Sequence, residues 1–479
     1  MVMRLQLDRY AYLDSPIHRW SPRFKFSFLA VVVVLFAAVQ QVWLVPLMVA
    51  FALGIYAASQ LPPGYLIHRL RYPGVFLLTL IVVLPFFAGE TVWLQLGPLS
   101  IKAEGVAYMV LVVGRFFSIL TVSIVIFSTS PFMTHVRELR SMGVSPILTD
   151  TLLLTVRYLY EISDMLSTMQ RAMRLRGFAM ERFNLRQAGQ LAGLMGTMLV
   201  RSYEQSERVY TAMRLRGYSA KEIDMNETTA ETALHLDAIE FAYPGHKKTL
   251  NGVTLEIKDG ERVGLIGPNG AGKSSLLLTV CGVHAPSGGS VALYDEPVDV
   301  GAFHPTVGLV FQNSNDQLFS ATVQDDVAFG PRNMGMDDEM AEKRATEALA
   351  LTGTEHLAER VPHHLSGGEK RMVSIASVVA MKPKLVLYDE PDANLDMRAR
   401  RKLIRFLQNA PHTVMLASHD LEMVLEVCDR VILLDDGRII ADGNPAEIMG
   451  DADLMEAHGL EKPHSLVPHR HGDGSLHRA

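Results

Sequence analysis

The sequence predicts two folds in one chain, an N-terminal all-α membrane domain and a C-terminal α/β P-loop domain. Three observations carry this prediction. Long apolar stretches dominate the first 130 of the 479 residues, a phosphate-binding loop motif occurs at 267–274, and a six-residue phrase occurs twice between them. We expect a membrane domain with coupling helices at residues 1–218 and a linker at 219–233. A nucleotide-binding domain is expected at 234–455 and a histidine-containing tail at 456–479.

Charge and cysteine content narrow the class of protein. The net charge of −6 conceals an asymmetry, because the first half is rich in arginine while most acids lie in the second half, which argues against nucleic acid as a partner. Only Cys281 and Cys428 occur, so no disulfide framework is expected and a reducing compartment fits. Residues 1–25 are polar and basic, so we expect no removable signal peptide.

Four apolar stretches predict four membrane spans. The run from about 26 to 58 exceeds the roughly 20 residues that one crossing needs, so it reads as two spans with a turn near Gln40-Gln41 or Pro46. The third span covers about 75–88 and the fourth about 106–127. The fourth contains Arg115, whose charge is costly at the bilayer centre, so we expect it to face protein or the interface.

The distribution of arginines predicts the topology. The N-terminal segment and the loop carrying Arg69 and Arg71 are basic, whereas the loop from Glu90 to Glu104 is not, so the basic segments are expected in the cytoplasm. The nucleotide-binding half must face ATP, so the number of spans is even. We choose four, with six as the alternative if 147–160 and 188–200 cross as a shallow pair. The predicted location is the cell membrane, multi-pass, with a cytoplasmic ATPase domain.

A duplicated phrase follows the spans, in a region of amphipathic helical pattern. Ala-Met-Arg-Leu-Arg-Gly occurs at 172–177 and again at 212–217, followed by Phe178 and Tyr218. Glycine suits a helix end because it adopts the left-handed conformation without strain. An exact repeat about 40 residues apart argues against a plain helical linker. The predicted coupling residues are Arg174, Arg176, Gly177, Arg214, Arg216 and Gly217.

The P-loop motif lies between an apolar strand at 262–266 and a helix at 275–280, the context that the motif requires. Its backbone amides and the helix N-terminus favour phosphate, Lys273 is expected at the β and γ phosphates, and Ser274 at magnesium. The predicted ATP-binding residues of this loop are Asn269, Gly270, Gly272, Lys273, Ser274 and Ser275.

A second apolar strand ends in two acids, Asp389 and Glu390. Such a strand delivers its last residues to the carboxyl edge of a parallel sheet, where ligands bind. We expect Asp389 to hold magnesium and Glu390 to orient or deprotonate the attacking water. A short helix before this strand opens with Ser366, Gly367, Gly368 and Glu369, a second predicted anion site.

With these motifs in place, residues 234–455 resemble the ATP-binding-cassette ATPases. The resemblance implies that Tyr243 stacks on adenine, that Gln312 couples magnesium to the transport domain, and that His419 contacts the γ-phosphate. It further implies that 366–369 closes over the ATP of an opposite subunit and that Asp396 lies in the interface loop. Two ATPase domains are therefore implied. Asn394 departs from the small residue frequent at its position, and we expect no loss of activity from it.

Two further segments narrow the resemblance. Asp316-Gln317-Leu318-Phe319 and 325–330 resemble the ATPase component of energy-coupling-factor importers, in which a short helix after the glutamine shapes a groove. The membrane T component of that family docks two Arg-Gly helix ends into such grooves, which the duplicated phrase resembles. Residues 8–11, 15–20, 155–159 and 201–210 are most similar to the cobalt and nickel type of T component. The chain thus resembles a natural T–A fusion, and the implied partners are a second ATPase domain, fused or separate, and a substrate-binding membrane protein.

Alternative interpretations remain open at this stage. A vitamin could replace the metal ion as substrate. A half-size cassette exporter also joins spans to an ATPase, although about 220 residues leave little room for its six long spans, and a membrane-tethered regulatory ATPase is a third class. The tail histidines His464, His469, His471 and His477 could bind metal, but a solvated end is the preferred interpretation because their spacing fits no defined geometry.

Overall fold

The structure is a computed structural model that describes residues 10–11, 13–87, 89, 91–96, 99–175, 185–218, 231–245, 247–393, 395–467, 469–470 and 476–477. Contacts divide the chain into two compact units, Met1–Met180 and Glu181–Ala479. Each unit is described by itself, and the expected boundaries at 218, 233 and 455 stay predictions.

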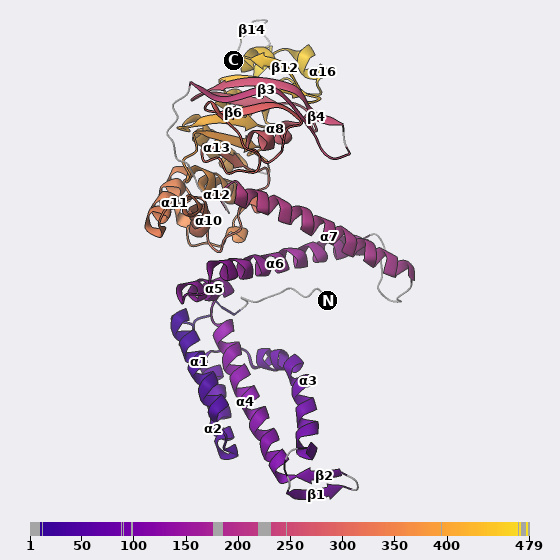
Figure 1. The fold of residues 1–479 in the computed structure, drawn as a ribbon, viewed down its shortest axis with the longest axis vertical. Coiled ribbons are helices and arrows are strands. Elements are labelled where there is room, and N and C mark those ends of the chain that lie inside the picture. Colours follow the sequence, from indigo (N-terminus) through magenta and orange to yellow (C-terminus); the bar gives the residue numbers. More distant parts are fainter. Residues whose placement is uncertain are drawn as a thin grey trace. The chain divides into compact units, whose positions relative to one another are not determined.

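Four helices of the first unit overlap the four predicted spans, although the third begins at Pro63, twelve residues before the expected start of its span (Figure 1). The apolar run breaks after Val39, next to Gln40-Gln41, as expected. These helices are α1 (Pro22–Ala38), α2 (Val45–Ala58), preceded by the 3₁₀ turn η1 (Val42–Leu44), α3 (Pro63–Phe87) and α4 (Ala103–Ser128). Two elements that the sequence did not predict, strands β1 (Val92–Leu96) and β2 (Leu99–Lys102), form an antiparallel hairpin between α3 and α4.

Helix α4 is the centre of this unit and packs against α1, α2 and α3. Its residues Val122, Val125 and Ile126 are fully buried. Val39 is the C-cap residue of α1, and its carbonyl accepts a hydrogen bond from the Arg115 guanidinium. This residue therefore faces protein, as expected, and satisfies a helix-end carbonyl that has no partner within its own helix.

Among the described residues, α4 alone is both long and apolar enough to cross a membrane by length and composition. The unit ends with α5 (Phe132–Ser141) and α6 (Pro146–Leu175). The stretch 147–160 lies within α6, and the stretch 188–200 lies within α7 (Leu185–Arg214), each a helix of 30 residues. The number of crossings stays a prediction.

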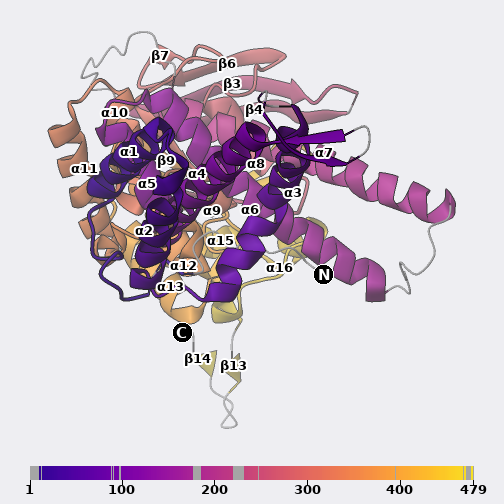
Figure 2. The same ribbon diagram turned by 90° about the horizontal axis from the view of Figure 1, so that it is seen from below.

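The second unit contains two sheets. A four-stranded antiparallel sheet has the order β4-β3-β6-β7, and Figure 2 shows its strands side by side. A six-stranded sheet has the order β12-β11-β5-β10-β9-β8 and is parallel except at β12. The strands are β3 (Thr232–Ala242), β4 (Lys248–Lys258), β5 (Arg262–Ile266), β6 (Gly288–Leu293), β7 (Glu296–Pro297), β8 (Val307–Val310), β9 (Leu385–Asp389), β10 (Thr413–Ala417), β11 (Arg430–Asp435) and β12 (Arg438–Gly443).

Helices cover the six-stranded sheet and complete the predicted α/β fold. One group, α10 to α12, shares a core of small and branched side chains that includes Ala341, Ala345 and Val373. The helices after α7 are α8 (Lys273–Val280), α9 (Ser314–Gln317), α10 (Val323–Asn333), α11 (Asp338–Thr352), α12 (Gly367–Val379), α13 (Met397–Gln408), α14 (Leu421–Val427), α15 (Pro445–Ile448) and α16 (Ala452–Ala457). Short 3₁₀ turns lie at Glu355–Leu357, Pro362–His364 and His464–Leu466, and the tail carries β13 (His469–Arg470) and β14 (Leu476–His477).

Candidate functional site

The phosphate-binding loop joins β5 to α8, as the sequence predicts. Gly267 and Gly272 have φ angles of 152° and 106°, which only glycine adopts without strain. A Cβ atom at Gly267 would lie 2.0 Å from the Leu434 carbonyl oxygen, and one at Gly272 would lie 2.8 Å from that of Thr249. The loop therefore requires glycine for close backbone approach as well as for conformation.

Lys273 begins α8 and folds back over the loop. Its Nζ donates to the carbonyls of Gly267 and Pro268 at 2.8 and 3.1 Å and lies 3.2 Å from Nε2 of His419. Burial lowers the pKa of this ammonium, whereas the carboxylates of Glu390 and Asp389 oppose the shift. The ammonium is thus held at the mouth of the loop, where an anionic phosphate would replace the carbonyl contacts.

The two acids at the end of β9 have different surroundings. Burial raises the pKa of Asp389 to about 6, and its Oδ1 accepts from the Ser274 hydroxyl at 3.0 Å. Glu390 has a φ of 43°, a strained value for a residue with a side chain, and its amide donates to the Ala417 carbonyl at 2.8 Å. The backbone thereby turns sharply at the carboxyl edge of the sheet.

Three predicted catalytic residues meet at Glu390. Its Oε2 accepts from Gln312 Nε2 at 2.5 Å, and its Oε1 lies 3.2 Å from His419 Nε2. These side chains come from three segments, after β8, after β9 and after β10. The structure therefore brings together the P-loop lysine, the two acids, the glutamine and the histidine that the sequence singled out separately.

The donor set beside the P-loop fits magnesium. Ser274 and Asp389 already touch, and Gln312 lies nearby, where its Nε2 donates to the Glu390 carboxylate. Hydroxyl, carboxylate and amide oxygens are the ligands that hard divalent cations prefer. Ser274 and Asp389 thus fit a divalent cation, and magnesium binding by Ser274, Gln312 and Asp389 stays a prediction.

Tyr243 lies at the edge of this site with 39% of its surface exposed. Its hydroxyl is 3.1 Å from the Ser275 hydroxyl and 3.2 Å from Nε2 of His284, and the His284 ring stacks on Phe241. The exposed ring is available to stack on a base. His284, which no sequence motif singled out, positions the Tyr243 hydroxyl.

The remaining predicted ATP-site residues make local contacts. Ser366 caps α12, and its side chain and that of Glu369 form a reciprocal capping box. Gly367 and Gly368 open the same helix, while Asp396 caps α13 by accepting from the amide of Ala399 at 2.8 Å. Asn394 falls outside the described residues. Roles at a subunit interface stay predictions for this set.

Arg371 is a residue that the sequence analysis missed. Its guanidinium is buried and donates to the carbonyls of Phe311 and Gln312 at 2.6 and 2.5 Å. Burial lowers its pKa to about 10. Helix α12, which begins at Gly367, therefore holds the backbone of Gln312. The adjacent Glu369-Lys370-Arg371 sequence offered no local signal for this long-range contact.

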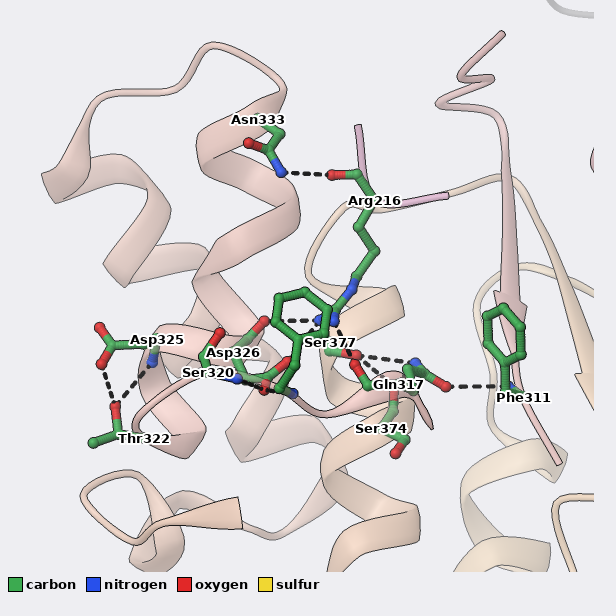
Figure 3. A network of polar contacts seen from close by, with 11 residues as sticks. Arg216, Phe311, Gln317, Ser320, Thr322, Asp325, Asp326, Asn333, Ser374 and Ser377 are labelled. Atoms are coloured by element: carbon green, nitrogen blue, oxygen red, sulfur yellow. Dashed lines mark hydrogen bonds and ion pairs between the residues drawn. The ribbon is translucent and has the colours of Figure 1, made fainter. Parts of the chain in front are cut away.

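The second copy of the duplicated phrase lies in a groove of the ATPase half (Figure 3). Arg216 is 2% exposed, and its guanidinium donates to Oδ1 of Asp326 at 2.8 Å, to the Asp326 carbonyl at 3.0 Å and to the Gln317 carbonyl at 2.5 Å. It also lies 4.3 Å from the ring centre of Phe319 and 5.2 Å from that of Phe329. This is the groove beside 312–319 that the sequence predicted.

The glycine after Arg216 ends the helix in the predicted way. The amide of Tyr218 donates to the Met213 carbonyl at 3.1 Å and that of Gly217 to the Arg214 carbonyl at 3.0 Å, the pair of bonds of a Schellman motif. Gly217 has a φ of 76°, and a Cβ there would lie 3.1 Å from Cβ of Asn333. Asn333 in turn donates to the Arg216 carbonyl at 3.0 Å.

A chain of hydrogen bonds links this groove to the backbone beside Gln312. The side chain of Gln317 accepts from the amide of Phe311 at 3.1 Å and donates to Ser374 and Ser377 of α12 at 2.8 and 3.0 Å (Figure 3). Phe311 directly precedes Gln312. The residue whose carbonyl binds Arg216 therefore also fixes the backbone next to the ATP site.

Two more arginines of this region contact the ATPase half. Arg208 of α7 pairs with Asp316 at 2.8 Å, and Arg214 donates to the Gly301 carbonyl. Arg208 was not predicted from the sequence. It lies eight residues before Arg216, which is about two helical turns toward the N-terminus of α7. The first copy of the phrase runs from the end of α6 into residues outside the described part, so Arg174, Arg176 and Gly177 stay predictions.

Comparison with known families matches both halves of the chain. The family CbiQ, described as a cobalt transport protein, matches residues 14–226, and the family described as ABC transporter matches residues 250–393. The two matches do not overlap, and residues 227–249 lie between them.

Curated relatives cover about half of this chain. A Synechocystis protein named as an ABC transporter ATP-binding protein is 50% identical over 234 residues, 49% of this chain and 82% of the relative. The energy-coupling factor transporter ATP-binding protein EcfA of Methanothermobacter thermautotrophicus is 42% identical over 238 residues, 48% of this chain and 76% of the relative. The solved structure of cbiO1 from Clostridium perfringens, part of the ABC transporter complex cbiONQ, is 34% identical and covers 47% of this chain and 94% of its own, with a TM-score of 0.43.

Proposed function

The chain belongs to the energy-coupling-factor ABC transporters, as a T component of the cobalt transport type fused to an ATPase, and we propose that it drives uptake of cobalt or nickel. The ATPase half hydrolyses ATP to power transport. A separate membrane protein captures the metal ion. The membrane half is multi-pass, and the ATPase half faces the cytoplasm. The match of residues 14–226 to the cobalt transport family carries the proposal of a metal substrate.

Hydrolysis uses the residues gathered at the end of β9. Lys273 binds the β and γ phosphates, and Glu390 accepts a proton from the attacking water or orients it. Gln312 and His419 hold the Glu390 carboxylate before ATP enters, through contacts of 2.5 and 3.2 Å. When bound, magnesium would neutralise charge on the phosphates, held by Ser274, Gln312 and Asp389.

Tyr243 stacks on the adenine, because its exposed ring lies next to Ser275 of the P-loop helix. The other half of the nucleotide site comes from a second ATPase domain. Its segment equivalent to Ser366, Gly367, Gly368 and Glu369 covers the bound ATP, with Asp396 at the interface.

Coupling runs through Arg216 and its equivalent in the first copy of the phrase. A displacement of Gln312 toward the nucleotide moves Phe311, whose amide is bonded to the Gln317 side chain, and the Gln317 carbonyl holds Arg216. The guanidinium fork engages several acceptors at once, a geometry that a lysine ammonium reproduces poorly. Movement at the ATP site is thereby passed to α7.

Uptake of labelled metal tests the substrate. Cells that express this chain together with a metal-capturing membrane protein and a separate ATPase subunit are expected to accumulate radioactive cobalt or nickel, because the complex then has both of its proposed partners. Lys273→Ala serves as the inactive control. Accumulation of a labelled vitamin without metal uptake would assign the module to a vitamin, and ATP-dependent loss of a compound from the cells would indicate export.

We further propose that the second ATPase is a separate subunit. In this chain the groove is filled by the chain's own Arg216, which is 2% exposed. A pair of fused chains would contain two grooves, and each groove would be occupied by the Arg216 of its own chain. The first copy of the phrase in each chain would then have no groove to bind. An unfused ATPase subunit supplies the missing groove.

Native mass spectrometry of the complex purified with its neighbouring gene products tests this stoichiometry. One fused chain with one separate ATPase subunit is expected, since two Arg-Gly helix ends then meet two grooves. A complex that contains two fused chains and no other ATPase would contradict the proposal. ATP turnover by the same preparation serves as the control for an intact complex.

A further inference from the structure

A cavity lies in the ATPase half, at the edge of the six-stranded sheet where the parallel strands begin, opposite the edge that carries the P-loop. It has a volume of about 530 Å³. Gly260, Lys384 and Thr413, at or just before the first residues of β5, β9 and β10, line it. The ATP-site acids stand at the opposite, carboxyl ends of the same strands. The cavity is therefore distinct from the ATP site, and its size falls within the range of small-molecule sites.

The walls of this cavity are mostly apolar. They include Ala348 and Leu351 of α11, Val379 of α12, and Pro383. Leu351 is 61% exposed, although it is a large aliphatic side chain on a helix whose other face is buried. An apolar wall with an exposed leucine at its mouth favours a ligand with an apolar body.

The buried polar groups of the cavity are already paired with one another. The Tyr294 hydroxyl donates to Oδ1 of Asp259 at 2.7 Å, as does the Thr413 hydroxyl at 2.9 Å. His412 bonds to the Tyr388 hydroxyl at 3.0 Å, and burial lowers the pKa of its ring to about 4, so the ring is neutral at pH 7. The hydrogen bonds fix the orientation of these side chains. The charge that would select a ligand comes from other side chains of the lining.

That charge is cationic. Arg344, Lys382 and Lys384 converge on the cavity from α11 and from the turn before β9. Lys384 Nζ lies 5.2 Å from the centre of the Tyr294 ring. Lys382 Nζ lies 3.9 Å from Oε2 of Glu347, and both side chains are about half exposed. An ion pair this exposed contributes little to stability. The three cations outnumber the two acids of the lining, Asp259 and Glu347, so the lining carries a formal net charge of +1 around an apolar interior.

We propose that this cavity is a binding site for a small organic carboxylate with an apolar body. The apolar part lies between Leu351 and Val379, and the carboxylate is bound by Arg344, Lys382 and Lys384. An arginine beside lysines suits a carboxylate, because the planar guanidinium can donate two parallel hydrogen bonds to it. The site stands independently of the proposed metal transport.

Binding of 4-fluorobenzoate to the purified full chain, followed by ¹⁹F NMR line broadening, tests the proposal. Saturable binding is expected for the wild type. The double substitution Arg344→Glu with Lys382→Glu is expected to weaken binding by at least about tenfold, because it replaces two of the three cations with acids. The neutral analogue 4-fluorobenzyl alcohol is expected to bind at least about tenfold more weakly than the carboxylate.

The control is Lys343→Glu, which makes the charge reversal of Arg344→Glu one residue away on α11, at a position that does not line the cavity. It is expected to bind like the wild type. Leu351→Trp, which fills the mouth without changing charge, is expected to abolish binding, and ATP turnover reports whether each variant is folded. Absence of saturable binding, equal loss in Lys343→Glu, unchanged binding in the double variant or in Leu351→Trp, or equal binding of the alcohol would each overturn the proposal.

Discussion

Glu390→Gln is expected to retain ATP binding while ATP turnover falls by roughly 10² to 10⁴-fold, the range for loss of a general base. Glutamine keeps the shape of the side chain, so the P-loop contacts of Lys273 and the fold of the site are preserved. It cannot accept the proton of the attacking water. Steady-state phosphate release and equilibrium binding of a fluorescent ATP analogue measure the two quantities separately.

The matched control for this experiment is Glu256→Gln. This variant makes the same carboxylate-to-amide change on β4 of the four-stranded sheet. The Glu256 side chain is exposed there and accepts a hydrogen bond from the Thr232 hydroxyl. Its turnover is expected to stay near that of the wild type. Near-normal phosphate release by Glu390→Gln would show that another group performs the role assigned to Glu390.

Arg216→Glu is expected to abolish metal uptake while the chain stays folded and membrane-bound. The substitution places a carboxylate against Asp326, which is fully buried and already accepts from the amides of Phe319 and Ser320 at 2.6 and 2.7 Å. Removing one partner of a buried ion pair costs about 3–5 kcal/mol, and a like charge adds repulsion. The helix end is therefore expected to leave the groove. Uptake of labelled metal together with membrane fractionation measures both outcomes.

Graded variants separate the geometry of Arg216 from its charge. Arg216→Lys is expected to give uptake between that of Arg216→Glu and the wild type, because one ammonium cannot hold three acceptors in the arrangement of the guanidinium. Arg201→Glu, an exposed position on the same helix, is the control and is expected to transport normally. We expect Arg176→Glu to behave like Arg216→Glu. Full uptake in Arg216→Glu would contradict the coupling role.

The predicted bounds of one strand in the ATPase half were confirmed, whereas two helices begin earlier than expected. The strand at 262–266 has the bounds that the apolar pattern predicted, but the helix expected at 275–280 begins at Lys273, and α12 begins at Gly367, two residues before the expected Glu369. The hairpin of β1 and β2 was not predicted, although the Gly97-Pro98 dipeptide between its strands is a turn signal, because the strands are short and lie between two apolar helices. The break beside Gln40-Gln41 was predicted, because polar residues interrupt an otherwise continuous apolar run.

By itself, the sequence determined the features that depend on neighbours along the chain. The P-loop glycines, the acids that end β9 and the glycine that ends α7 were all predictable, because backbone conformation and strand direction are set locally. Only the tertiary structure decided which distant groups meet. Arg216 and Asp326 are 110 residues apart, Arg371 reaches the backbone beside Gln312, and the cationic cavity assembles from three strand ends and α11. Such contacts depend on how the sheet and helices pack, and no spacing along the chain encodes them.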